Sequence, residues 1–316
     1  MVQTTAAKVV IVGTGFVGAT TAYALMISGL VSELVLLDVN RQKAEGEAMD
    51  LNHAASFVKP ILIYAGDYPD CRDAQIVIFT AGANQKPGET RLHLAVQNVQ
   101  IIQEELPKII RHCPQAIVIV VANPVDILTY AALKVSGLPS ARVMGSGTVL
   151  DSSRFRHVIS RHCRVDARNI HAYVIGEHGD TEVPVWSLAN IAGIPLDEYY
   201  SIWGQRCVVE DKQALFEQVR TAAYQIIERK GATYYAIGLA IRRICEAILR
   251  DEYSILTISS LIDNIYGVSD ICLSLPCLVN ERGRERIIAL PLSESEISAF
   301  RQSAETLRAI LRQLNL

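Results

Sequence analysis

The chain has 316 residues, of which half are apolar and a fifth are charged, as is typical of a soluble globular enzyme with one large or two smaller domains. Its net charge of -3 gives no electrostatic reason to expect nucleic acid or an anionic membrane as a partner. The seven cysteines are odd in number and none forms a Cys-x-x-Cys pair, so we expect no disulfide framework and no metal centre, and a reducing cytoplasm. Glycines interrupt the first apolar stretch, so we expect neither a signal peptide nor a membrane span.

The first half of the chain alternates short apolar strands with helices. Strands are predicted at residues 8–12, 33–38, 61–64, 75–80, 116–121 and 142–144. Helices are predicted at 16–27, from a cap at Asn40 to about 56, at 92–111 and after Pro124. Continuous apolar runs of this length are typical of strands buried on both faces. The alternation predicts a doubly wound parallel α/β sheet of the Rossmann type.

The second half has a mixed pattern. Helices are predicted at 150–163, 207–230 and 233–250, and strands at 170–175, 183–187, 254–262 and 271–280. A turn at 264–267 joins the last two strands, and a final helix begins with Ser293 and Glu296, which have the spacing of a capping box. We therefore expect a nucleotide-binding domain over residues 1–145 and a C-terminal α+β substrate domain over residues 146–316.

The most specific local motif is the G-x-G-x-x-G of Gly13–Gly18, which follows a strand and opens a helix. Gly13 allows a tight turn, Gly15 lets the backbone approach a pyrophosphate, and Gly18 lets helix and strand pack closely. Phe16 and Val17 begin the helix whose N-terminus receives the phosphates. Asp38 ends the next strand, where it can bind a ribose hydroxyl and disfavour a 2′-phosphate. The motif predicts NAD; the alternative is a glycine turn that serves packing alone.

Two further strand ends carry polar residues. The loop 81–91 is polar, contains Gly and Pro, and ends in Arg91; a loop beside the nucleotide is where a lid belongs. Arg91 could polarise a carbonyl oxygen, or it could be a solvated surface arginine. Asn123 ends another strand and could bind a ligand or only cap the next helix.

Three residues of the second half suggest acid–base chemistry. Asp151 and Arg154 are three apart in a predicted helix and so share a face, and an arginine fork suits a carboxylate. The alternative for that pair is a local helical ion pair. His178 lies in a Gly-Glu-His-Gly turn, and histidine is the side chain that titrates nearest to neutrality. A lone histidine is more often structural than catalytic, but the combination favours a catalytic one.

Together these segments resemble the L-lactate dehydrogenases of the lactate/malate dehydrogenase superfamily, nearly end to end. The resemblance implies NADH-dependent reduction of pyruvate to (S)-lactate. It implies that His178 is the proton donor and acceptor and that Asp151 orients it. It also implies that Arg154 binds the substrate carboxylate and that Arg91 polarises the carbonyl.

The resemblance also assigns the pocket. Asn123 is expected to contact substrate and cofactor, Thr233 the substrate, and Ile237 the nicotinamide. Gln85 occupies the position where malate dehydrogenases have an arginine, so a second substrate carboxylate would have no partner, which favours pyruvate over oxaloacetate. His93 departs from the small polar or acidic residue that we expect there. A malate or other 2-hydroxy acid dehydrogenase remains the nearest alternative, and a non-catalytic NAD-binding protein a remote one.

A second, regulatory site is also suggested. Arg156 and His171 match the positions that bind fructose 1,6-bisphosphate across a subunit interface in the allosteric bacterial members of this family. Two cationic side chains suit a phosphate, whereas the alternative is two surface charges without a ligand. The resemblance implies a homotetramer, and a site at an interface requires at least a dimer.

Overall fold

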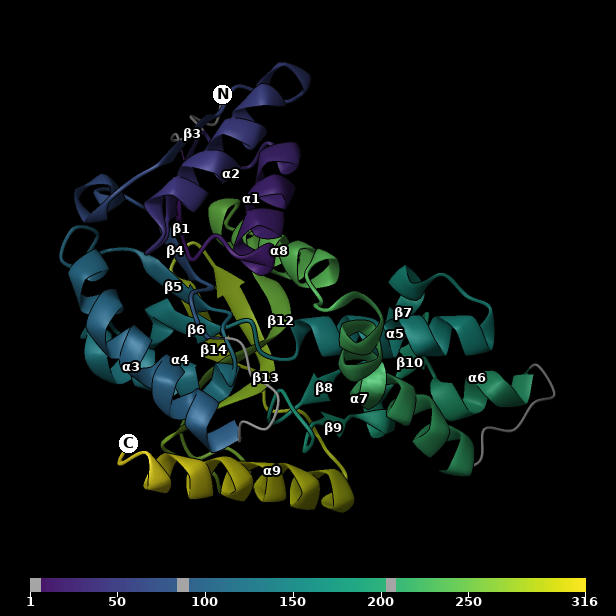
Figure 1. The fold of residues 1–316 in the computed structure, drawn as a ribbon. Helices are drawn as coiled ribbons and strands as arrows, with labels where there is room; N and C mark the ends of the chain where they lie inside the picture. Colours follow the sequence, from purple (N-terminus) through teal and green to yellow (C-terminus); the bar gives the residue numbers. More distant parts are fainter. Residues whose placement is uncertain (1–6, 84–90, 203–208) are drawn as a thin grey trace.

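The computed structural model describes residues 7–83, 91–202 and 209–316. Within these ranges one large sheet runs through the whole molecule, in the order β3-β2-β1-β4-β5-β6-β12-β13-β14 (Figure 1). Its parallel strands are β1 (Lys8–Val12), β2 (Glu33–Leu37), β3 (Leu62–Ala65), β4 (Ile76–Phe79), β5 (Ile117–Val120) and β6 (Val143–Gly145). The order of these strands is that of a doubly wound dinucleotide-binding sheet, so the predicted fold class is confirmed.

Helices cover both faces of this sheet. Successive side chains of a strand point to opposite faces, so Val9 and Ile11 enter one core while Val10 and Val12 enter the other. The first of these cores is covered by α1 (Phe16–Ser28), α2 (Arg41–His53) and α8 (Tyr235–Leu249). The other is covered by α3 (Arg91–Ile110), α4 (Val125–Ser136) and α9 (Glu294–Gln313). Asn40 caps α2 and Ser293 forms a capping box with Glu296, as predicted.

The C-terminal half does not build a separate large sheet. Its strands β12 (Ser254–Ile262), β13 (Ile271–Asn280) and β14 (Gly283–Ile287) extend the first sheet in antiparallel fashion. The two halves join where Ser259 of β12 pairs with Gly145 of β6. A side chain could not fit at the junction, because a Cβ on Gly147 would lie 2.4 Å from the Ser259 nitrogen. Both halves therefore share one continuous sheet.

A third core lies beside this layer and supports the rest of the C-terminal half. It is formed by residues of α5 (Val149–Cys163), α6 (Leu196–Ile202), α7 (Val209–Lys230) and the short strands β7 (Ile170–His171), β8 (Val174–Ile175) and β10 (Asn190–Ile191). The strands β9 (Val183–Pro184) and β11 (Ile194–Pro195) pair with β8 and β10. In Figure 1 these elements lie together to one side of the large sheet.

Several predicted boundaries were wrong, most of them in the C-terminal half. The strand expected over 170–175 is two separate strands, β7 and β8, which belong to different small sheets. The strand expected over 183–187 ends at Pro184, and a 3-10 turn begins at Trp186. The helix expected to reach about 56 ends at His53. The elements α6, β10, β11 and β14 were not predicted. The two-residue strands β10 and β11 are too short to show a hydrophobic period, α6 has only seven residues, and three of the five residues of β14 are charged.

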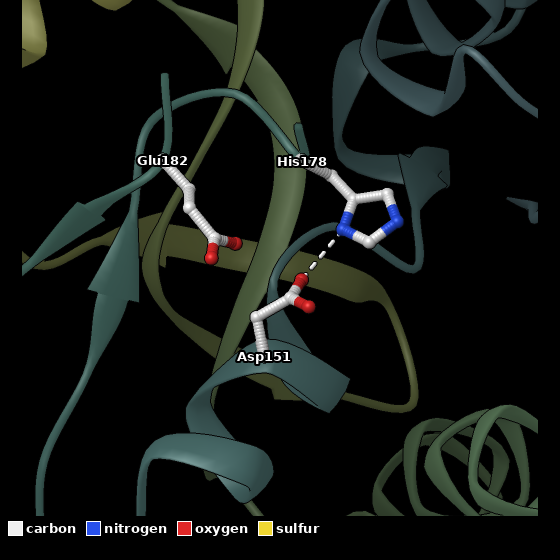
Figure 2. Close-up of side chains that lie close together, drawn as sticks. All are labelled: Asp151, His178 and Glu182. Atoms are coloured by element: carbon white, nitrogen blue, oxygen red, sulfur yellow. Dashed lines mark hydrogen bonds and ion pairs between the residues drawn. The ribbon is translucent and has the colours of Figure 1, made fainter. Parts of the chain in front are cut away.

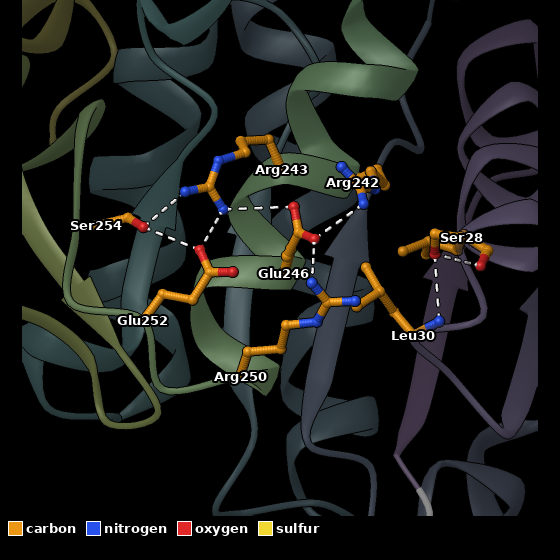
Figure 3. A network of polar contacts seen from close by, with 9 residues as sticks. Ser28, Leu30, Arg242, Arg243, Glu246, Arg250, Glu252 and Ser254 are labelled. Carbon is orange, nitrogen blue, oxygen red and sulfur yellow. Dashed lines mark hydrogen bonds and ion pairs between the residues drawn. The ribbon is translucent and has the colours of Figure 1, made fainter.

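The C-terminal end of α8 is fixed to the start of β12 by a polar network (Figure 3). Glu246 accepts hydrogen bonds from Arg242 at 2.9 Å and from Arg250 at 2.7 Å. Arg243 donates to Glu246 at 3.5 Å and to the Ser254 hydroxyl at 2.6 Å. A network that shares one shielded carboxylate stabilises more than an isolated surface pair does. The helix that carries Ile237 is thus anchored to the central sheet.

Candidate active site

The glycine turn after β1 has the geometry that its three glycines were predicted to provide. Gly13 adopts a φ of +91°, and a Cβ there would lie 2.7 Å from the Ala81 backbone. A Cβ on Gly18 would lie 2.0 Å from the Gly13 carbonyl oxygen. Gly15 is different, because a Cβ there would meet nothing within 4 Å among the described residues. The backbone at Gly15 thus borders open space, where a pyrophosphate can approach it.

The remaining groups of the turn also fit a dinucleotide. Gly15 is the N-cap of α1 and provides no side-chain cap, so the first N–H groups of that helix are available to phosphate oxygens. Asp38 accepts hydrogen bonds from the Thr14 N–H at 2.7 Å and from the Thr14 hydroxyl at 2.9 Å. Burial opposes ionisation of Asp38, but the hydrogen bonds from Thr14 and Asn40 lower its pKa overall. An ionised carboxylate at this position suits a ribose hydroxyl and repels a 2′-phosphate.

The segment before α8 lies against this turn. The Phe16 ring, 69% exposed, stacks on the Tyr234 ring with centroids 5.3 Å apart. Tyr234 adjoins Thr233, and Ile237 and Val17 both pack against the core beneath α1 and α8. The structure thereby brings Thr233 and Ile237, which are far from residue 16 in sequence, to the nucleotide turn.

The turn that carries His178 follows β8 and is fixed from several sides. The Gly176 N–H donates to the Ser274 carbonyl on β13 at 2.9 Å. The Glu177 N–H donates to the Ser303 hydroxyl on α9 at 2.8 Å. Gly176 has a φ of +86°, a conformation that favours glycine. The position of the His178 backbone is therefore set by elements that are distant in sequence.

Asp151 links the histidine to the arginine. His178 Nδ1 lies 2.5 Å from Asp151 Oδ2, and Arg154 Nη1 donates to Asp151 Oδ1 at 2.8 Å. The Asp151 side chain is 3% exposed and the His178 side chain 26%. The helical ion pair considered as an alternative for Arg154 thus exists, but a guanidinium has five N–H donors and can bind a further carboxylate.

This arrangement shifts both pKa values. Burial alone would lower the pKa of His178, but the Asp151 carboxylate, assisted by Asp126 and Glu182, raises it to about 9. Burial would raise the pKa of Asp151, but His178 and Arg154 lower it overall. At neutral pH the pair is therefore an imidazolium held by a carboxylate, and His178 Nε2 carries a proton that can be transferred.

Two buried acids beside His178 were missed by the sequence reasoning. Glu182 faces the Asp151–His178 pair (Figure 2), and burial and the Asp151 charge raise its pKa to about 8. Asp126, at the start of α4, accepts a hydrogen bond from the His178 N–H at 2.8 Å. For Asp126 the sequence offered one signal of burial, because this acid stands between the apolar residues Val125 and Ile127.

Side-chain atoms of Asp151, His178 and Glu182 lie within 4.8 Å of one another, close enough to hold a metal ion. However, Asp151 is already paired with the Arg154 cation and the His178 ring, and a histidine must be neutral to ligate a metal. The arrangement of charges therefore favours an acid–base cluster over a metal centre.

The remaining predicted site residues lie on several different elements, and some fall outside the described residues. Arg91 begins α3, and its side chain, like the whole of Gln85, lies outside the described residues. Asn123 is exposed at the end of β5, and its carbonyl accepts from Asn98 at 2.7 Å. Arg156 on α5 and His171 on β7 lie on elements that contact each other.

A dinucleotide turn together with a histidine paired to a buried aspartate in the other half defines an NAD-dependent oxidoreductase. Residues 7–145 match the NAD binding domain of lactate/malate dehydrogenase, and residues 148–315 match the alpha/beta C-terminal domain of the same family. The chain belongs to the lactate/malate dehydrogenase family, and NAD is its cofactor.

Individual relatives agree with this assignment. The chain is 60% identical to the L-lactate dehydrogenase of Moorella thermoacetica over 98% of each chain, and 55% identical to that of Acetivibrio thermocellus over the same shares. It superimposes on the minor L-lactate dehydrogenase of Enterococcus mundtii with a TM-score of 0.94 and 44% identity, covering 98% of both chains. A lactate dehydrogenase from a deep-sea metagenome library has a TM-score of 0.95 and 47% identity, covering 98% of this chain and 99% of its own.

Proposed function

We propose that this chain is an L-lactate dehydrogenase that interconverts pyruvate and (S)-lactate with NAD(H). The observation that carries the proposal is the chain of contacts His178–Asp151–Arg154, which the hydrogen bond from His178 to Asp126 joins to the nucleotide-binding half. The identity to curated L-lactate dehydrogenases supports it.

In the proposed reaction Arg154 binds the substrate carboxylate with the N–H donors that Asp151 does not use. His178 then gives the proton on Nε2 to the substrate carbonyl oxygen, while Asp151 keeps the ring oriented. Arg91 is proposed to polarise that carbonyl. Bound nicotinamide is the source or acceptor of the hydride. Because reduction requires a protonated His178, whose pKa is raised to about 9, kcat/KM for pyruvate should fall as the pH rises through that value.

We propose that Gln85 sets the preference for pyruvate, because it offers no positive charge to a second carboxylate. Thr233 and Asn123 are proposed to line the substrate side of the pocket, and Asn123 and Ile237 the nicotinamide side. The test is the rate of NADH loss with pyruvate and with oxaloacetate, for the wild type and for Gln85→Arg. We expect the wild type to prefer pyruvate and the variant to shift toward oxaloacetate by roughly 10³-fold in the ratio of kcat/KM. A wild type that prefers oxaloacetate would make the malate dehydrogenase alternative correct.

Regulation by fructose 1,6-bisphosphate is the second part of the proposal. The Arg156 guanidinium makes no ion pair or hydrogen bond with any group in the described ranges. Burial lowers the pKa of Arg156, and a bound phosphate would offset that cost. His171, on the neighbouring strand, is exposed. The bisphosphate should lower KM for pyruvate; an unchanged KM in wild type would exclude the effect.

We also propose that the chain forms a homotetramer and acts in the cytoplasm. The adjacent helices α1 and α8 expose large apolar side chains: Phe16, Tyr23, Ile27, Tyr235 and Leu239. Contiguous exposed apolar surface of this kind marks association sites. No helix in the described part of the chain is long and apolar enough to span a membrane. Sedimentation would report the oligomeric state, and a monomer at micromolar concentration would contradict the proposal.

A further inference from the structure

The turn that carries His178 has little secondary structure of its own to hold it (Figure 2). It runs from residue 176 to residue 182 and joins β8 to β9, which pair over only two residues each. A pair of strands this short is marginal by itself. The direction of the His178 side chain must therefore be set by contacts from outside this hairpin.

The C-terminal helix α9 supplies such a contact through one hydroxyl. Ser303 is fully buried on α9, and α9 lies against β9. The Ser303 oxygen accepts the N–H of Glu177, the residue before His178, at 2.8 Å. It also lies 3.1 Å from the hydroxyl oxygen of Thr181, which follows His178 in the same turn. One side chain of α9 thus contacts the turn on both sides of the histidine.

The polar atoms of this cluster form a closed ring. An ionised carboxylate can only accept hydrogen bonds, and that of Glu177 accepts from the Thr181 hydroxyl. Because a hydroxyl has a single proton, the Ser303 hydroxyl then donates to Thr181. The ring runs from the Glu177 N–H to Ser303, from Ser303 to Thr181, and from Thr181 back to the Glu177 carboxylate. Each hydroxyl donates once and accepts once, and a buried polar network that is satisfied in this way is rigid.

Two glycines of the turn leave the space in which the ring closes. A Cβ on Gly176 would lie 2.9 Å from the Ser303 hydroxyl oxygen. A Cβ on Gly179 would lie 2.8 Å from a carboxylate oxygen of Glu177. The glycines on either side of Glu177 and His178 therefore make room for the ring as well as for the bend of the chain.

We propose that Ser303 is a positioning residue for His178: through the ring with Glu177 and Thr181, it fixes the turn so that the imidazole stays against Asp151. The inference rests on the proposed function, which assigns the proton transfer to His178. Ser303 acts through the turn, and no contact between Ser303 and the substrate is proposed.

The contact between His178 and Asp151 is what the ring should control. Burial alone would lower the pKa of His178, but Asp151 raises it to about 9, so a looser turn should lower that pKa. Removing a hydroxyl of the ring changes none of the charged groups around the imidazole. These are Asp126 on α4, Asp151 and Arg154 on α5, and Glu177 and Glu182 on the turn.

The test removes the two hydroxyls one at a time. Ser303→Ala and Thr181→Val each open the ring, and each should lower kcat about tenfold. KM for pyruvate and NADH affinity should stay within about twofold, because neither Arg154 nor the glycine turn is altered. The double variant should lose little more than either single variant, whereas independent sites would lose about 100-fold. Thr181→Ser keeps the hydroxyl and should keep kcat within about twofold of wild type.

A second readout needs no turnover. Diethyl pyrocarbonate acylates only the neutral imidazole, so its rate of reaction with the His178 peptide, followed by mass spectrometry against pH, titrates that histidine. The midpoint should move down by roughly one-half to one pH unit in both single variants. The matched control is Ser298→Ala, which makes the same substitution at an exposed position of the same helix. It should leave the midpoint and kcat unchanged.

A loss of stability alone would overturn the proposal: if kcat per folded enzyme and the acylation midpoint equal those of wild type, the ring is only structural. Losses that multiply in the double variant would also overturn it. If Ser303→Ala does not fold, Thr181→Val and Thr181→Ser decide by the same two readouts. A wild type that does not reduce pyruvate would refute the proposed function, yet the acylation midpoint would still report on the ring.

Discussion

The glycine turn and the His178 turn are both loops at strand ends, but they are held in different ways. The glycine turn is held mostly by the first β-strands of the nucleotide-binding half: Asp38, 24 residues away, accepts from Thr14, and the Thr80 hydroxyl on the neighbouring strand end donates to the Gly13 carbonyl. The His178 turn is held by Asp151, Asp126 and Ser303, at 27, 52 and 126 residues from their partners. The first turn depends on the space left by absent side chains, and the second on buried charge. We therefore expect an added side chain to disrupt the glycine turn by steric overlap, and a change of protonation to disrupt the His178 turn.

The largest expected effect is at the second turn. His178→Asn keeps a similar shape but has no group that titrates near neutrality, so turnover should fall by about 10³-fold or more. NADH binding should stay within about twofold, because the groups proposed to bind the dinucleotide do not include His178. Steady-state kinetics with pyruvate and a fluorescence titration with NADH would measure the two effects. Retained turnover would refute the role of His178.

The next largest effects are expected at two glycines of the first turn, where alanine should have different consequences for stability and for NADH binding. Gly18→Ala places a Cβ 2.0 Å from the Gly13 oxygen, so unfolding should require about 3 kcal/mol less free energy, at the upper end of overpacking. Gly15→Ala meets no described atom within 4 Å and should cost about 1 kcal/mol or less, but it should weaken NADH binding about tenfold. Denaturant unfolding without ligand and NADH titration check both values. Equal destabilisation by the two variants would contradict the argument from space.

Protonation at the second turn predicts a dependence of stability on pH. Burial raises the pKa of Glu182 from 4.5 to about 8, so between these values the folded state binds more protons than the unfolded state. Its contribution to the free energy of unfolding therefore falls as the pH rises from about 4.5 to about 8.

The glutamine side chain in Glu182→Gln cannot ionise. The variant should therefore not lose unfolding free energy as the pH rises through this range. Relative to wild type, the variant should gain about 1–3 kcal/mol of unfolding free energy between pH 5 and pH 8.5. Urea unfolding at both pH values measures the gain. Glu228→Gln, on the exposed surface of α7, should change stability by less than about 0.5 kcal/mol at either pH. A pH-independent difference for Glu182→Gln would mean that its carboxyl is not buried as described.

The smallest effect is expected at the hydrogen bond between Thr14 and the Asp38 carboxylate in the first turn. Thr14 is fully buried and its hydroxyl donates to Asp38 at 2.9 Å. Thr14→Val removes this hydrogen bond and should cost about 1 kcal/mol of stability, together with a few-fold loss of NADH affinity. Thr14→Ser keeps the hydroxyl and should behave like wild type in the same titration.

The contrast also explains what could be predicted from the sequence. The strands and helix around Gly13–Asp38 were placed within a residue or so of their observed ends, since apolar runs and glycines report local structure. Asp126 and Glu182 were missed because an acid in the first turn of a helix, or in a turn, is usually solvated. Their surroundings come from residues distant in sequence: Ser259 on β12 lies beside Asp126, and Asp151 on α5 lies beside Glu182. Asp151, Arg154 and His178 were singled out by helical spacing and by a glycine-flanked turn, and the family resemblance then implied their roles; no local signal indicated that Asp151 is buried.

The junction at Gly145 and Ser259 also has a consequence for synthesis on the ribosome. The edge of β6 is covered by β12, whose pairing residue lies about 110 residues downstream, so at typical rates of translation it stays uncovered for roughly 5 to 20 seconds. During that time the nascent nucleotide-binding half presents an unpaired, apolar strand edge, which is prone to pair with other chains. Truncated chains that end before Ser254 should therefore aggregate, even though they contain every strand of the parallel sheet.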